Sequence, residues 1–153
     1  MKYKLTKKTK KIGNLTLHQI QAVKDFSDVK KGDFGGWIEK KINLSQKNNA
    51  WVSGDAQVYG NAMVSGNARV CGDAWVSGNA QVYGDAGVFW DAQVYGDAGV
   101  SDNARIYGNA RIYGNAMVSG RYDLTVSCNF ELKRITIDTK DKLMKLKKFL
   151  DKF

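Results

Sequence analysis

Side chains that could perform acid–base or nucleophilic chemistry are few in this sequence and lie far apart. There is one histidine, His18, and there are two cysteines, Cys71 and Cys128. A histidine works as a general base when a nucleophile or a carboxylate lies beside it. The sequence shows no Ser/His/Asp spacing, no phosphate-binding glycine loop before a helix and no metal-ligand cluster. We therefore expect no catalytic residue, no metal site and no cofactor.

Three aspartates recur at a spacing that could place their carboxylates in one column. Asp55, Asp73 and Asp91 lie 18 residues apart, and like charges about 5 Å apart would attract a cation. Asn and Asp are also turn formers, because their side chains bond the nearby backbone. Asn109 continues the same column, which favours the turn interpretation.

The element that must position all of these side chains is a six-residue repeat. Alanine occupies every sixth position from Ala50 to Ala116, and Val or Ile follows two residues later, which makes 12 hexads over residues 50–121. Alternation of Ala, any residue and Val predicts a short strand. The Gly-Asn or Gly-Asp that follows predicts a corner. Three hexads then form one triangular 18-residue coil, whose Ala and Val side chains fill a narrow core.

The repeat resembles that of the hexapeptide-repeat proteins, which fold as a left-handed parallel β-helix. The segment QAVKDFSDVKKGDFGGWIEKKINLSQKNNAWVSG is similar to the N-terminal part of uncharacterised members from bacteria and their phages, often labelled acyltransferases. The family more often has glycine directly after the aliphatic residue, whereas here Ser53 separates Val52 from Gly54. The resemblance implies an all-β fold and a left-handed coil. It implies little about function, because a fold supports many activities.

The chain is expected to form one folded domain with three parts: an N-terminal β cap at 1–49, the β-helix of about four coils at 50–121, and a C-terminal strand and helix at 122–153. Leu44 precedes Ala50 by six residues, so a degenerate hexad is expected to begin there. The segment YDLTVSCNFEL is either one more imperfect turn or a strand that leaves the coil. The last segment predicts an amphipathic helix capped by Asp138 or Thr139. Its apolar stripe either covers the open end of the coil or packs against a second subunit, and it consists of Leu143, Leu146, Phe149, Leu150 and Phe153.

The net charge of +9 is carried by the two flanks of the repeat. Residues 1–49 contribute +8, residues 50–121 contribute −2 and residues 122–153 contribute +3. Basic flanks attract nucleic acid or acidic protein surfaces, and they also keep a chain soluble. The basic start leads into no apolar stretch, and two cysteines are too few for a disulfide framework, so we expect a cytoplasmic protein that does not enter a membrane.

The coil formed by residues 86–103 departs from the repeat more than any other. Both lost corner glycines, at Trp90 and Asp102, fall in it, and so do the outward glycines Gly87 and Gly99. We expect Phe89 and Trp90 to form a raised knob beside a notch left by Gly87. Two alternatives are that Trp90 lies beneath a terminal segment and that it is neutral drift at a tolerant corner. Tyr, Trp and Arg are enriched at interface hot spots. The candidate partner-binding residues are Phe89, Trp90, Tyr95, Arg105, Tyr107 and Arg111.

The function that this sequence favours is a non-enzymatic binding or scaffold protein that recognises a protein through its aromatic and arginine-rich faces. Because the resemblance includes phage proteins, one concrete version is a phage-borne inhibitor of a host defence protein such as a CRISPR nuclease. One alternative is nucleic-acid binding through the Lys-rich flanks. The other is a hexapeptide-repeat acyltransferase, which would need His18 to reach a subunit cleft. A homo-oligomer, either a dimer or the trimer common in the resembling family, is also an option.

Overall fold

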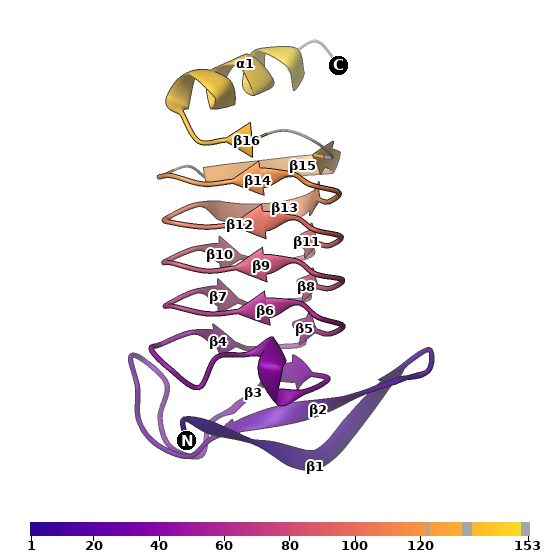
Figure 1. The fold of residues 1–153 in the computed structure, drawn as a ribbon, viewed down its shortest axis with the longest axis vertical. Helices are drawn as coiled ribbons and strands as arrows, with labels where there is room; N and C mark the ends of the chain where they lie inside the picture. The colour runs from indigo at the N-terminus through magenta and orange to yellow at the C-terminus, as the bar shows by residue number, and fades with distance from the viewer. Residues whose placement is uncertain (122, 133–135, 151–153) are drawn as a thin grey trace.

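The chain folds into a triangular column of stacked coils that is closed by a different element at each end (Figure 1). The structure is a computed structural model and describes residues 1–121, 123–132 and 136–150. Each coil contributes one short strand to each of three faces, and every strand pairs in parallel with the strand one coil above or below it. The column is therefore a parallel β-solenoid, as the six-residue repeat predicts.

Face A and face B share one long strand near the C-terminal end of the column. The strands of face A are β4 (Trp51–Val52), β7 (Arg69–Val70), β10 (Gly87–Val88) and the first part of β13 (Arg105–Ile112). The strands of face B are β3 (Phe34–Ile38), β5 (Gln57–Val58), β8 (Trp75–Val76), β11 (Gln93–Val94) and the second part of β13.

Face C carries five strands in one ladder. They are β6 (Met63–Val64), β9 (Gln81–Val82), β12 (Gly99–Val100), β14 (Met117–Val118) and β16 (Thr136–Ile137). In Figure 1 these strands lie in front and run to the left, while β7 and β10 behind them run to the right as the chain climbs. That path is a left-handed winding, as the resemblance implied.

The interior of the column consists of the repeated Ala and Val or Ile side chains. From Ala50 to Val118 every one of them is at most 1% exposed. An alanine fits where two faces converge, and a valine or isoleucine fills the middle of each face. A two-residue strand buries little area alone, so burial of apolar surface between stacked coils supplies most of the stabilisation. The sequence prediction of the core is confirmed.

The corners of the column require a left-handed backbone, and ten of them use a glycine with φ between 63° and 100°. A Cβ at Gly78 would lie 2.9 Å from the backbone nitrogen of Gly96 in the next coil, so a side chain there would be crowded as well as strained. The Asn and Asp that follow the glycines form ladders. For example, the Asn67 amide donates to the Asp85 carboxylate at 2.9 Å. These hydrogen bonds join side chains of successive coils, whereas the turn interpretation expects each side chain to bond its own backbone.

The N-terminal end is closed by an antiparallel hairpin of β1 (Tyr3–Ile12) and β2 (Leu15–Ala22), and β2 pairs with β3. Strand β3 already pairs in parallel with β5, so the stack begins before residue 50. A short 3-10 helix, η1 (Lys41–Asn43), follows β3. Leu44 is fully buried and pairs with Val64, so it takes a valine position of face C rather than the alanine position that its spacing from Ala50 indicates.

The C-terminal end is closed by a further turn and a helix. Strand β15 (Asp123–Leu132) pairs in parallel with β13, so the segment after the repeat continues the solenoid rather than leaving it. Helix α1 (Lys140–Leu150) lies across the end of the column (Figure 1). Thr139 Oγ1 accepts a hydrogen bond from the backbone N–H of Lys142 at 3.4 Å and caps the helix start. Leu143 and Leu146 are buried against the core, which confirms the capping role. The predicted stripe also includes Phe149, Leu150 and Phe153, whose side chains lie outside the described residues, as does Tyr122.

Candidate partner-binding surface

The two corners that lack glycine keep the geometry of the corners that have it. Trp90 has φ of 60° and Asp102 has φ of 57°. A left-handed backbone costs a non-glycine residue about 1–2 kcal/mol. Asp102 recovers part of this cost, because its Oδ2 accepts a hydrogen bond from the backbone N–H of Gly120 at 3.2 Å. Among the side-chain hydrogen bonds of the described residues, none stabilises the corner at Trp90 as that of Asp102 does at its own corner.

Phe89, Trp90 and Tyr107 form one cluster, here called the aromatic knob. Phe89 stacks on Tyr107 with ring centroids 4.9 Å apart and planes 17° apart. Trp90 leans on the same tyrosine at 5.3 Å and 49°. The side chain of Trp90 is nevertheless 58% exposed, so no terminal segment covers it in the described part of the chain. The knob is therefore a pre-formed aromatic surface at the corner between faces A and B.

The predicted notch beside Phe89 is wrong. A Cβ at residue 87 would collide with the Phe89 ring, which shows that the ring lies over Gly87 and fills the space that this glycine leaves. Gly99 on face C is covered in the same way by the Met117 side chain from the coil above. Each outward glycine thus makes room for a large neighbour.

The other predicted binding residues do not join the knob. Tyr95 lies on face B and stacks on Tyr113 at 5.0 Å with planes 8° apart. Arg105 is exposed on face A directly above Gly87, and Arg111 is half-buried on face B above Gln93. Of the six candidates, the structure brings Phe89, Trp90 and Tyr107 into contact and places Arg105 one coil above Gly87.

A pocket of about 490 Å³ lies on face A beside the knob. Phe89 of the knob and residues of the N-terminal segment 28–34 both line it. Arg69 in this pocket forms an ion pair with Asp28. The residues that line the pocket are Asp28, Val29, Asp33, Phe34, Trp51, Ser53, Arg69, Cys71 and Phe89.

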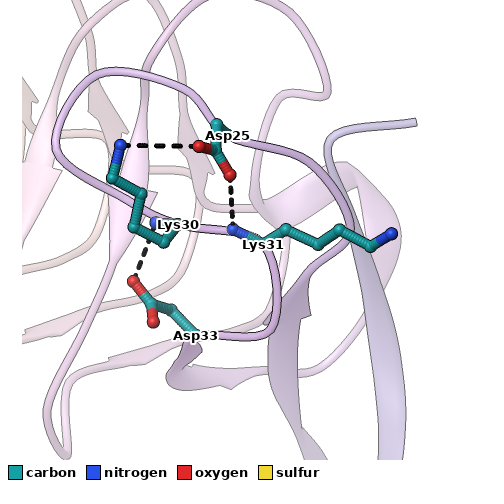
Figure 2. A network of polar contacts seen from close by, with 4 residues as sticks. All are labelled: Asp25, Lys30, Lys31 and Asp33. Atoms are coloured by element: carbon teal, nitrogen blue, oxygen red, sulfur yellow. Dashed lines mark hydrogen bonds and ion pairs between the residues drawn. The ribbon is translucent and has the colours of Figure 1, made fainter.

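The loop that walls this pocket is held in shape by its own carboxylates (Figure 2). Asp25 accepts the backbone N–H of Lys31 at 2.8 Å and lies 3.4 Å from the Lys30 ammonium. Asp33 accepts the backbone N–H of Lys30 at 2.8 Å. Sequence reasoning missed this pocket, because the loop shows no repeat and its position over face A follows from long-range packing. The spacing of Asp25 and Asp33 around a Lys-Lys-Gly turn was the local signal that could have suggested an ordered loop.

Cys71 lies half-buried in the lining of the pocket. Burial raises the pKa of its thiol, and the nearby Arg69 opposes that shift only in part. A thiol with a raised pKa is a poor nucleophile at neutral pH. The geometry therefore gives Cys71 a packing role.

His18 lies on β2 in the N-terminal cap, where its Nδ1 is 3.2 Å from the carbonyl oxygen of Thr6. That contact lies within the hairpin, and His18 is not among the residues that line the pocket on face A. Among the described residues, no group of three or more His, Cys, Asp and Glu side chains has the geometry of a metal site. None of the described helices is long and apolar enough to cross a membrane.

Comparisons with known proteins agree with the repeat architecture. The sequence model of a family described as the YdcK beta solenoid repeat matches residues 56–72, 64–78, 68–84 and 110–121. A protein of Escherichia coli (strain K12) named "Uncharacterized acetyltransferase YdcK" is 46% identical to this chain over 39 residues. The match covers 26% of this chain and 12% of that protein. The resemblance to hexapeptide-repeat proteins labelled as acyltransferases is thereby confirmed, and the residues that the family model matches lie within the repeat.

Proposed function

We propose that this β-solenoid protein is a non-enzymatic binding protein whose aromatic knob docks onto a protein partner. The observation that carries the proposal is Trp90, a bulky side chain held at a positive φ and 58% exposed. Glycine serves the same corner in most other coils at no strain. A residue that costs folding energy and remains in solvent is best explained by an interaction outside the chain.

The chemistry around Trp90 supports a protein as the partner. Trp, Tyr and Arg are the residues most enriched at interface hot spots, where a rigid aromatic group enters a pocket of the partner. The Tyr107 ring, which is itself stacked on Phe89, packs against the indole, so little side-chain entropy is lost on binding. Arg105 is exposed on the same face and can pair with a carboxylate beside the aromatic contact.

The resembling phage proteins suggest one version of this function. In that version the protein inhibits a host defence protein, such as a CRISPR nuclease, by binding to it. The proposal depends on the knob and not on that version. Acetyl transfer, which the name of the E. coli protein raises, would require a base. His18 is the one histidine in the sequence, and its ring contacts a backbone carbonyl inside the hairpin. We therefore favour binding over catalysis.

The proposal is tested by affinity purification of the tagged protein from its host cell, beside two variants. Trp90→Gly removes the indole and restores the glycine of the repeat. Tyr83→Ala is the matched control, because it removes a 38% exposed ring from a separate place on the column. A protein that co-purifies with wild type and Tyr83→Ala, and is absent with Trp90→Gly, supports the proposal. Loss of a hot spot of at least 2 kcal/mol lowers affinity by roughly 30-fold or more. A partner retained by Trp90→Gly, or acetyl-CoA turnover that depends on His18, contradicts the proposal.

A further inference from the structure

The β1–β2 hairpin carries an unusually one-sided charge. Residues 1–24 contain seven lysines and neither Asp nor Glu. Five of the lysines lie on strand β1, which is the outer edge of its sheet. Figure 1 shows the hairpin projecting to the right beyond the stack of coils. The lysines of β1 are Lys4, Lys7, Lys8, Lys10 and Lys11.

The carboxylates of the N-terminal region are engaged elsewhere and do not neutralise these lysines. Asp25 and Asp33 close their own loop (Figure 2). Asp28 pairs with Arg69, and the carboxylate of Glu39 accepts a backbone N–H from the next coil at 2.7 Å. Within the described residues, none of the ion pairs involves a lysine of β1. The hairpin therefore presents uncompensated positive charge.

The lysines occupy both faces of the hairpin. Lys8 and Lys10 both reach over the Trp37 ring, with their ammonium nitrogens 5.5 and 5.8 Å from its centroid. Side chains alternate along a strand, so Lys11 points to the face opposite Lys10. The remaining exposed side chains of the hairpin are hydrogen-bonding groups such as Thr9 and Asn14. A flat acidic protein surface would meet only one of these two faces.

We infer that the hairpin enters a groove of duplex DNA. The major groove is about 12 Å wide and admits a two-stranded β-ribbon. A ribbon in a groove has a phosphate backbone on each side, which matches lysines on both of its faces. Threonine and asparagine side chains are common donors to phosphates and base edges. Lysines on an edge strand also prevent pairing between sheet edges, but that purpose requires neither five of them nor their distribution over both faces.

The number of lysines sets the expected salt dependence. Each phosphate contact lowers log K by about 0.9 for each tenfold rise in salt concentration. Five contacts give a slope of about −4.5. Removal of two contacts reduces the slope to about −2.7 and weakens binding by roughly 60-fold at 0.1 M salt.

The test is fluorescence anisotropy of the full chain with a labelled 20-base-pair DNA duplex at several salt concentrations. Lys7→Gln/Lys11→Gln removes two exposed hairpin charges. Lys145→Gln/Lys148→Gln on α1 is the matched control, because both double variants lower the formal net charge from +9 to +7. Circular dichroism verifies that each variant is folded. The labelled duplex is also challenged with polyglutamate, and the matching single strand is measured in parallel.

Duplex binding with a slope near −4.5 that falls with the hairpin variant, and not with the helix variant, supports the inference. Equal losses in both variants would indicate a response to net charge alone and would overturn it. Tighter binding of the single strand, or displacement of the duplex by an equal charge of polyglutamate, would show that the hairpin does not recognise a duplex groove and would overturn the inference. Absence of duplex binding would also overturn it, and the role of the lysines would then be to prevent pairing between sheet edges. The Trp90→Gly variant should bind the duplex as wild type does, so this test and that of the proposed function fail independently.

Discussion

The sharpest stability prediction concerns residue 90, where glycine should give a more stable protein than alanine, the reverse of the usual order. In ordinary strands and helices, glycine destabilises relative to alanine by about 0.5–1 kcal/mol. At a φ of 60°, the Cβ of alanine is strained by about 1–2 kcal/mol and glycine is not. Trp90→Gly and Trp90→Ala lose the same contact with Tyr107, so that loss cancels between them. Trp90→Gly should therefore be the more stable of the two by about 1 kcal/mol.

Thermal unfolding followed by circular dichroism measures this difference. For a domain of about 150 residues, 1 kcal/mol corresponds to about 2–4 °C in Tm. Gly78→Ala is the reciprocal control, since it introduces a Cβ at a φ of 68° only 2.9 Å from the next coil and should lower Tm by several degrees. If Trp90→Ala unfolds at the same temperature as Trp90→Gly or above it, Trp90 is not strained, and the argument that its retention reflects function fails.

Three further predictions follow from the caps and the pocket. Burial lowers the pKa of Lys2 to about 8 and raises that of Tyr3 to about 12. The unfolded chain therefore binds more protons at Lys2 between pH 8 and 10.5, and the folded chain binds more at Tyr3 between pH 10 and 12. Urea unfolding should show stability rising from pH 8 to about 10 and falling above it, with the rise absent in Lys2→Met; a steady fall from pH 8 would contradict this. The raised pKa of Cys71 predicts that a Cys128→Ser variant reacts with iodoacetamide at pH 7 more slowly than free cysteine does, and a faster reaction would refute the packing role. Leu143→Ala should lower the unfolding free energy by roughly 2 kcal/mol, whereas an unchanged value would show that α1 does not close the column.

The column itself could be predicted from the sequence because the repeat restricts every residue in the same way. Ala and Val at fixed spacing admit one inward face, so the pairing of Trp51 with Arg69 follows from counting 18 residues along the chain. The closing helix was predictable for a related reason, since its buried Leu143 and Leu146 are spaced for one helix face.

The surface could be predicted only in part, because it depends on where large side chains turn after they leave the backbone. Gly87 indicated free space, but the Phe89 ring had a choice of rotamers and took the one that fills that space. The exposure of Trp90 depended on the course of distant segments, which the repeat does not encode. The pocket escaped prediction for the same reason, since its loop contacts face A through the pair of Asp28 and Arg69, far apart in sequence.

The most direct test of the account is the affinity of the purified partner for wild type, Trp90→Gly and Tyr83→Ala, measured by isothermal titration calorimetry at one salt concentration. The account predicts that Tyr83→Ala binds within about twofold of wild type and that Trp90→Gly binds at least about 30-fold more weakly while remaining fully folded. Equal affinity of all three proteins would show that the exposed indole contributes nothing to recognition, and it would contradict the central claim.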